Sequence, residues 1–254
     1  MLTADFGHMP ISAPGDPCGH LSLLGGFAID GVSLPGRAQR LVAYLGIHRR
    51  RQTRHRLAEW LWPNRSPGVA LGNLRQAVFE EHHAGHRLVQ SSREELWLAP
   101  SVTVDLHEVV VDVRQLLVSP ALVAPEFDQS RLVHDLLPAW DDEWLEAERE
   151  RFRELRLHGL EALGEFCLDS GQWARAVEAA LTAVAVDPFR ESVRALLIRA
   201  YVAERNLRRA LEAYESYRDL LRRDMGCDPS TGLLQLLSGQ VSILDANNDR
   251  VTLG

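Results

Sequence analysis

A repeat of 34 residues in the second half of the chain constrains its fold more than any other feature. Residues 173–177 (WARAV) match residues 207–211 (LRRAL), and the preceding segments 160–171 and 194–205 align at the same spacing. A 34-residue period of paired helices, with small residues where the helices cross, is typical of tetratricopeptide repeats. One such unit cannot bury its apolar face alone, so neighbouring units stack. The sequence therefore predicts an all-helical stack, closed by a last helix near residues 233–244.

The stretch Thr53–Phe79 predicts two short helices joined by a tight turn. Thr53 can cap the first helix. Its apolar residues fall at i, i+3 and i+4, on one helical face: Leu57, Trp60 and Leu61. The helix ends at Trp62, because the residue before a proline, here Pro63, is disfavoured in the α region.

The second of these helices restarts the chain with Ser66 as N-cap and Pro67 as first residue. Its apolar stripe is formed by Leu71, Leu74 and Val78, and its outward surface carries Gly72, Arg75 and Gln76. A capped helix, a tight turn and a second helix with small and polar outward residues is typical of the helix-turn-helix of DNA-binding proteins. An ordinary helical hairpin would explain these residues equally well.

Strand signals precede the two helices. Residues 21–26 and 27–35 are strand-like, and Asp30-Gly31 is a strong signal for a tight hairpin turn. Residues 37–47 predict a further helix, and the short basic segment 49–53 could add a strand.

A second hairpin is predicted after the two helices. Residues 86–90 and 95–98 have strand character, and the turn between them presents Arg93 at its tip. Strands, a helix, two more helices and a terminal hairpin make a winged helix, in which this hairpin would be the wing.

The charge is divided unevenly along the chain. Residues 1–104 carry a net charge of +3 and residues 105–254 a net charge of −10, which add to the total of −7. All 28 basic residues are arginine, so chemistry that requires a lysine is excluded: a Walker A loop, a Schiff-base enzyme and a Ser–Lys hydrolase. A basic first half and an acidic second half place any nucleic-acid contact in the first half.

The cysteines and histidines do not suggest a metal or redox centre. Cys18, Cys167 and Cys227 are few and far apart, so a disulfide framework is not expected and the compartment is expected to be reducing cytoplasm. The histidines at positions 82, 83 and 86 are interpreted as solvated side chains at a helix end. No apolar run reaches the roughly 20 residues that span a bilayer, and the first twenty residues lack the pattern of a signal peptide.

Beyond Pro100 the pattern becomes helical. Asp105 can cap a helix that runs to about Val118, and residues 140–169 predict a long, charged amphipathic helix. The acidic residues 141–143 lie at its start, where carboxylates complement the helix dipole, so they are not read as an acid–base pair.

Six segments of the chain are similar to segments of a known protein family. They are RLAEWLWP (56–63), NLRQAV (73–78), WLAPSVTVDL (97–106), LLPAWDDEWLEAERERFRELRLHGLEAL (136–163), AVAVDPFRESVRALLIRAYVAERN (183–206) and YESYRDLLRRDMGCDPS (214–230). Over roughly residues 21–245 the chain resembles the SARP family of bacterial transcriptional activators. These proteins join an OmpR-type winged helix to a helical, tetratricopeptide-like bacterial transcriptional activator domain. The resemblance implies binding to direct repeats near promoters and engagement of RNA polymerase.

The chain departs from the family in its recognition helix. Where such helices usually continue with an arginine and a leucine, this chain has Glu80 and Glu81. By helical phase Glu81 falls near the apolar stripe and Glu80 near the outward face. A carboxylate that faces phosphate opposes the main electrostatic term in DNA affinity.

The expected fold is mainly α, with an α+β winged helix-turn-helix followed by an all-α tetratricopeptide-like domain. The expected divisions are a flexible tail (1–20), the winged-helix DNA-binding domain (21–104), the tetratricopeptide-like activator domain (105–245) and a tail (246–254). Base or near-base contacts are predicted for Asn73, Arg75 and Gln76. Phosphate contacts are predicted for Arg49, Arg50, Arg51, Arg54, Arg56 and Arg65, and a wing contact for Arg93.

The predicted function is sequence-specific regulation of transcription, with activation favoured. The expected partners are double-stranded DNA and RNA polymerase; a homodimer is left open, and no membrane, cofactor, metal or catalytic residue is expected. Leu24-Gly25-Gly26 lacks the rest of a dinucleotide fingerprint. The alternative is a tetratricopeptide adaptor whose winged helix no longer binds DNA. Glu80, Glu81 and the net charge favour this alternative, and the arginine cluster opposes it.

Overall fold

The computed structural model describes residues 19–84 and 87–236. Contacts divide these residues into two compact units. The first unit holds the described chain up to His107 and the returning segment Leu136–Trp144, and the second holds Glu108–Asp135 and the chain from Leu145 onward. The first unit is thus assembled from two stretches, whereas the predicted domains are continuous in sequence. The predicted tails lie outside the described residues, except that positions 19 and 20 already belong to a strand.

A small sheet opens the first unit. β1 (Gly19–Ser22) pairs antiparallel with β2 (Ala28–Ile29) and parallel with β6 (Val102–Val104). The predicted tight turn at Asp30-Gly31 is present, and Gly31 adopts a φ of 68° there. Among the described residues, a single bridge between Ile29 and Val32 spans this turn, and β2 pairs with β1.

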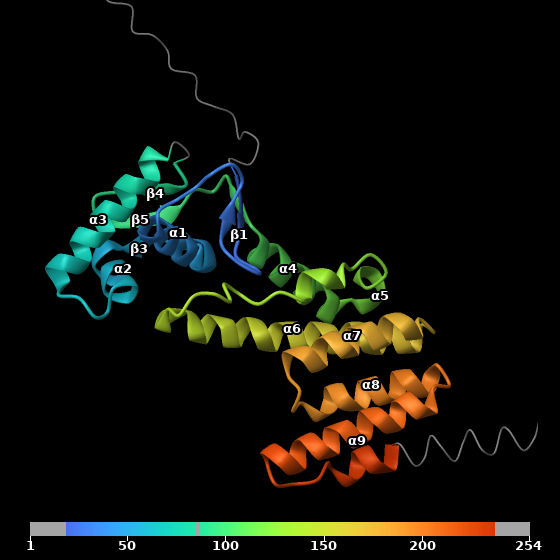
Figure 1. Ribbon diagram of the computed structural model, residues 1–254. Coiled ribbons are helices and arrows are strands. Elements are labelled where there is room, and N and C mark those ends of the chain that lie inside the picture. Colours follow the sequence, from blue (N-terminus) through green and yellow to red (C-terminus); the bar gives the residue numbers. More distant parts are fainter. Residues whose placement is uncertain (1–18, 85–86, 237–254) are drawn as a thin grey trace, which may run out of the picture. The chain divides into compact units, whose positions relative to one another are not determined.

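Three helices form the body of the first unit: α1 (Gly36–His48), α2 (Arg54–Leu61) and α3 (Pro67–His83) (Figure 1). α1 is buried along most of its length and contacts α3, which also packs against α2. Thr53 and Ser66 occupy the predicted N-cap positions, although neither side chain accepts a capping hydrogen bond. The predicted helix, turn and helix are therefore confirmed.

The predicted apolar face of α2 is wrong at one position, Trp60. Leu57 and Leu61 are buried, but Trp60 is 51% exposed, and Ala58 takes the third buried position. The buried residues of α2 are thus Leu57, Ala58 and Leu61, and α2 packs against α3.

The wing is a second small sheet with the strand order β3-β5-β4. β3 (Gln52–Thr53) and β4 (Val89–Ser91) both pair antiparallel with β5 (Glu95–Leu98). The added strand in the basic segment and the hairpin with Arg93 at its exposed tip are confirmed. The first strand begins at Val89 rather than at residue 86, which lies outside the described residues.

The returning segment Leu136–Trp144 completes the first unit. It is held by a hydrogen bond, an ion pair and a ring contact: Leu137 N to Leu23 O (2.9 Å), Arg40 Nε to Asp142 Oδ1 (2.8 Å) and Trp144 to Tyr44 (5.1 Å between ring centroids). Asp105 fixes the same region, since its carboxylate accepts hydrogen bonds from Leu23 N and Leu24 N at 2.9 to 3.1 Å. Asp105 therefore joins the start of a helix to the loop after β1.

The second unit contains most of α4 (Asp105–Val118), α5 (Pro120–Val123), a 3₁₀ turn at Gln129–Leu132 and nearly all of α6 (Glu143–Asp169). α6 begins three residues later than the predicted start at residue 140. The helix is preceded by a turn at residues 138–139, in which Trp140 N donates to Leu137 O at 3.1 Å, and residues 140–142 are not helical.

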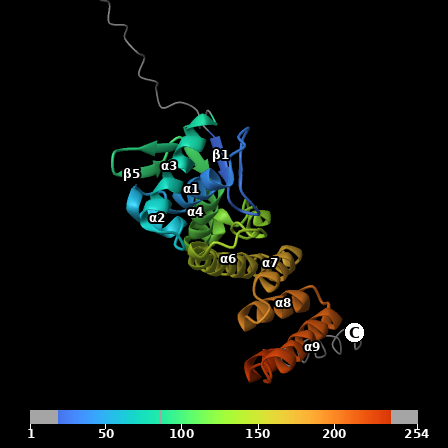
Figure 2. The same cartoon turned by 60° about the vertical axis from the view of Figure 1, so that its left-hand side comes forward.

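The predicted repeat is confirmed in α7 (Trp173–Val186), α8 (Glu191–Ala203) and α9 (Leu207–Asp224), which follow one another in Figures 1 and 2. The turns before α7 and α9 have the same geometry: Gln172 N donates to Cys167 O at 2.8 Å, and Asn206 N donates to Tyr201 O at 2.8 Å. Of the predicted last helix, residues 231–236 are helical, and Leu233 packs with the core around Tyr217. The remainder of that helix lies outside the described residues.

Candidate nucleic-acid interface

The buried face of α3 is rotated from the predicted stripe. It consists of Ala70, Leu74, Ala77 and Glu81, at i, i+4, i+7 and i+11. Leu71 and Val78, which were predicted to share the stripe with Leu74, are only half-buried. The two alanines are buried, and α3 packs against both α1 and α2.

The outer face of α3, on the opposite side, carries one polar pair and two large apolar side chains. Arg75 and Gln76 are exposed, as predicted. Asn73 lies on the flank and is half-buried. Val69 and Phe79 are 52% and 53% exposed. Sequence reasoning did not single out these two residues, although the helical phase that puts Gly72 and Gln76 on the outer face also places them outward. Gln76 is exposed, and Gly72 is half-buried.

The two glutamates of α3 have different roles from those expected. Glu81 is fully buried, and its Oε1 accepts backbone hydrogen bonds from Leu88 N and from Val89 N, the latter at 3.2 Å. It is thus a structural carboxylate that anchors the first strand of the wing. Glu80 is half-buried rather than outward, and its Oε1 accepts a hydrogen bond from Gln76 Nε2 at 3.1 Å.

Two of the predicted phosphate contacts also support the wing. The Arg51 guanidinium lies 4.1 Å above the ring of Trp97, and its Nη1 is 3.6 Å from Glu95 Oε2. Arg54 Nη2 donates to Ser92 O at 3.1 Å, which joins the start of α2 to the wing tip. A cation over an aromatic face and a charged donor on a carbonyl are both stabilising contacts. These arginines therefore fix the wing beside the basic segment.

The other predicted arginines are exposed, and their side chains form no hydrogen bond or ion pair with any residue of the described ranges: Arg49, Arg50, Arg56, Arg65, Arg75 and Arg93. Arg87 is a further exposed arginine that sequence reasoning missed. With Gln90 and Trp97 it lines a depression of about 510 Å³ between the end of α3 and the wing. Solvated guanidinium groups without internal partners are free to meet an anion.

Arg65 lies near acidic residues of the returning segment. It lines a pocket of about 340 Å³ at the turn between α2 and α3, together with Asp141 and Asp142 of the returning segment. These carboxylates reduce the positive potential at the turn, and Asp142 is also paired with Arg40.

The described histidines of the predicted cluster contact the protein itself. His82 Nε2 lies 3.3 Å from Val89 O, and His83 stacks on Phe79 with 3.9 Å between ring centroids. His86 lies outside the described residues. Within residues 19–84 and 87–236, no three His, Cys, Asp or Glu side chains gather as a metal site requires. No helix among these residues has the length and apolar character needed to cross a membrane.

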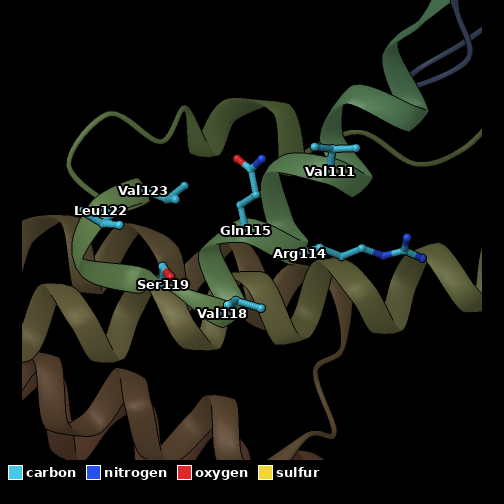
Figure 3. A pocket seen from close by; sticks show the side chains of 7 residues that line it. All are labelled: Val111, Arg114, Gln115, Val118, Ser119, Leu122 and Val123. Carbon is cyan, nitrogen blue, oxygen red and sulfur yellow. The ribbon is translucent and has the colours of Figure 1, made fainter.

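An apolar groove lies in the second unit. Its volume is about 500 Å³, and it is lined by Val111, Arg114, Gln115, Val118, Ser119, Leu122 and Val123 (Figure 3). Val118 and Leu122 are 83% and 82% exposed. A groove with this lining suits apolar contact with a protein rather than contact with phosphate.

Comparison with known proteins agrees with this architecture of a winged helix and a helical repeat unit. Residues 132–238 match the family model of the bacterial transcriptional activator domain. The chain is 35% identical over 124 residues to the regulatory protein AfsR of Streptomyces coelicolor, which covers 46% of this chain and 12% of that protein. The chain therefore spans about an eighth of the length of this relative.

A solved structure, Mycobacterium tuberculosis EmbR in complex with a low-affinity phosphopeptide, is similar with a TM-score of 0.68. It is 22% identical in sequence, and the match covers 88% of this chain and 65% of EmbR. The likeness confirms the predicted fold class, a winged helix followed by a tetratricopeptide-like helical domain. Together these comparisons support the resemblance of the chain to the SARP family of bacterial transcriptional activators, and the family-model match covers the second, helical part of the chain.

Proposed function

We propose that this chain is a sequence-specific DNA-binding regulator of transcription that inserts α3 into the major groove. The observation that carries the proposal is the outer face of α3, where Arg75 and Gln76 are exposed on a rigid helix whose opposite face is packed into the core. The major groove admits an α-helix and presents a distinct pattern of donors and acceptors for each base pair.

Arg75 and Gln76 are the base-reading residues in this proposal. An arginine can donate two hydrogen bonds to guanine, and a glutamine can bind the adenine edge in the same bidentate way. Gln76 must first exchange its hydrogen bond to Glu80 for one to the base. Asn73, half-buried on the flank of α3, is placed for a contact beside the base edges rather than at their centre.

The phosphate backbone is contacted from the basic segment and the wing. Arg49, Arg50 and Arg56 supply charge beside β3, and Arg93 supplies it at the wing tip. Arg51 and Arg54 hold the wing in position for these contacts. Phosphate contacts of this kind fix the register of a protein on DNA without selecting a sequence.

The second unit serves protein contact and assembly. The family resemblance supports activation from direct repeats near promoters, with engagement of RNA polymerase by the helical unit. The stacked helices α7, α8 and α9 form an extended surface of the kind that repeat proteins use for partners.

The test selects duplexes from a random pool with the full chain and then measures affinity by fluorescence anisotropy as salt is varied. We expect preference for the selected duplex over random DNA. Because each phosphate contact adds nearly one unit to the slope of log K against log salt, we expect a slope of roughly −2 to −5. Arg208→Ala, which removes an exposed arginine from α9, is the matched control and should change neither affinity nor slope. Equal, weak binding to all duplexes would overturn the proposal.

The second candidate function is a protein-interaction adaptor. It is favoured by the apolar groove, in which Val118 and Leu122 are almost fully exposed. If the full chain selects no duplex while Leu122→Asp abolishes binding to a partner protein, the adaptor replaces the DNA-binding regulator.

A further inference from the structure

The outer face of α3 carries a row of residues along the helix axis that includes more than its two polar residues. Val69, Gly72, Gln76 and Phe79 fall at i, i+3, i+7 and i+10, which is a single line along one helical face. Arg75 lies beside this line. Positions 69 and 76 are about 10 Å apart along the axis. The major groove is about 12 Å wide, so the part of the line from Val69 to Gln76 fits within it.

Gly72 is not explained by packing inside the protein. A Cβ added at Gly46, Gly159 or Gly164 would lie only 2.6, 2.9 or 2.6 Å from a neighbouring side chain, so close packing explains these helical glycines. A Cβ at Gly72 would meet only Arg75 Nη2, at 4.0 Å, which is an ordinary contact. Glycine inside a helix is unfavourable compared with alanine. Its use here is consistent with a close approach from outside the protein.

Val69 supplies an apolar surface in the same line. Its side chain is 52% exposed, one turn before Gly72 on the half of α3 that lies nearest the helix-turn-helix turn. The apolar group that a base pair presents in the major groove is the C5-methyl of thymine. A valine methyl group is therefore matched to a thymine and to no polar base edge.

We propose that Val69 is a specificity residue that packs against the C5-methyl of a thymine, with Gly72 as the point of closest approach between α3 and the bases. The inference rests on the proposed function and adds a base that the polar residues do not read. Positions 69 and 75 are about 9 Å apart along the helix, which corresponds to roughly three base pairs of 3.4 Å. The thymine therefore lies within about three base pairs of the guanine contacted by Arg75.

The first test replaces each thymine of the selected duplex in turn with deoxyuridine, which removes only the methyl group. For the full chain, we expect one replacement near the guanine to weaken binding by about fourfold, the effect of one buried methyl group. In Val69→Ala the same replacement should have no effect. Phe79→Ala is the control and should keep the fourfold loss. The inference would be overturned if no deoxyuridine replacement changed the affinity, or if Val69→Ala still lost affinity on the same replacement.

The second test uses Gly72→Ala, because its two effects have opposite signs. Alanine favours the helix by about 1 kcal/mol and meets no close neighbour, so the melting temperature of the first unit should rise by about 4–8 °C. The affinity for the selected duplex should fall at least tenfold, because the added methyl group holds the helix away from the bases. Gly164→Ala is the packing control: it should lower the melting temperature and leave affinity unchanged, because its Cβ would lie 2.6 Å from Leu196.

The proposed function and the roles of Val69 and Gly72 are overturned by different results. If the full chain selects no duplex, the proposed function and this inference fall together. If it selects a duplex but the deoxyuridine scan is flat and Gly72→Ala binds normally, only the roles of Val69 and Gly72 are overturned.

Discussion

Glu81 Oε1 accepts a hydrogen bond from the backbone N–H of Val89 at 3.2 Å, which ties the last part of α3 to the first strand of the wing. The carboxylate is fully buried and also accepts from Leu88 N. The two elements proposed to contact DNA are therefore joined by one side chain. A departure from the family pattern at this position serves the fold rather than the DNA contact.

Glu81→Ala should destabilise the first unit by about 1–3 kcal/mol, because it leaves buried backbone N–H groups without an acceptor. Hydrogen exchange measured by NMR should show faster exchange at Leu88 and Val89. Glu59→Ala, an exposed change on α2, is the matched control. Exchange at Leu88 and Val89 that stays as slow in Glu81→Ala as in the control would contradict the anchoring role.

Asp105→Ala should lower the free energy of unfolding of the first unit by about 1–3 kcal/mol. The carboxylate accepts from Leu23 N and Leu24 N, so its removal leaves the loop after β1 without this support. Asp105→Asn keeps one acceptor oxygen and should lose less. Urea denaturation monitored by tryptophan fluorescence measures both variants, and equal losses would show that the hydrogen bonds to the loop are not what matters.

Arg205→Gly should stabilise the second unit, by up to about 1 kcal/mol. Arg205 and Gly171 occupy equivalent turns of the repeat, with φ of 58° and 71°. This left-handed region is unfavourable for residues with a side chain and costs glycine little. Gly171→Ala should destabilise by about 1–2 kcal/mol, and strain alone would be the cause because no atom lies within 4 Å of the added Cβ. Thermal unfolding tests the pair, and a stabilising Gly171→Ala would contradict the strain argument.

In a Cys18→Ser variant, a thiol reagent should modify Cys227 and spare Cys167. Cys227 is exposed, whereas Cys167 is buried and burial raises the pKa of its thiol. Only the thiolate reacts. Because the pKa of this thiol is higher in the folded chain than in the unfolded chain, where it is about 8.5, its contribution to the free energy of unfolding is fully present below about pH 8.5. That contribution is lost as the pH rises through the pKa of the folded state. Mass spectrometry of the labelled peptides decides, and rapid labelling of Cys167 in the folded chain would refute its burial.

Local signals in the sequence predicted the elements that local chemistry controls. Ser66 and Pro67 marked the start of α3, because caps and prolines act over a few residues. The match of residues 173–177 with 207–211 predicted the paired helices of the repeat. The wing hairpin was predicted from its strands and turn for the same reason.

Features that depend on distant partners were not predictable. The phase of α3 was misread because large apolar residues were taken for the buried face, whereas close helix packing selects Ala70 and Ala77. The returning segment contacts Leu23, more than a hundred positions earlier in the chain, and no periodicity reports such a contact. Arg51 and Arg54 were predicted only as phosphate contacts, since their partners Trp97 and Ser92 lie in the wing, about 40 positions further along the chain.

Comparing Arg75→Ala with Arg50→Ala on the selected duplex and on random DNA tests base reading by α3 most directly. A bidentate arginine–guanine contact is worth about 1–3 kcal/mol, so Arg75→Ala should weaken the selected duplex by roughly 5- to 150-fold while random DNA changes little. Arg50→Ala should weaken both DNAs equally, as the loss of a phosphate contact does. Equal loss on both DNAs for Arg75→Ala would contradict the placement of α3 in the major groove.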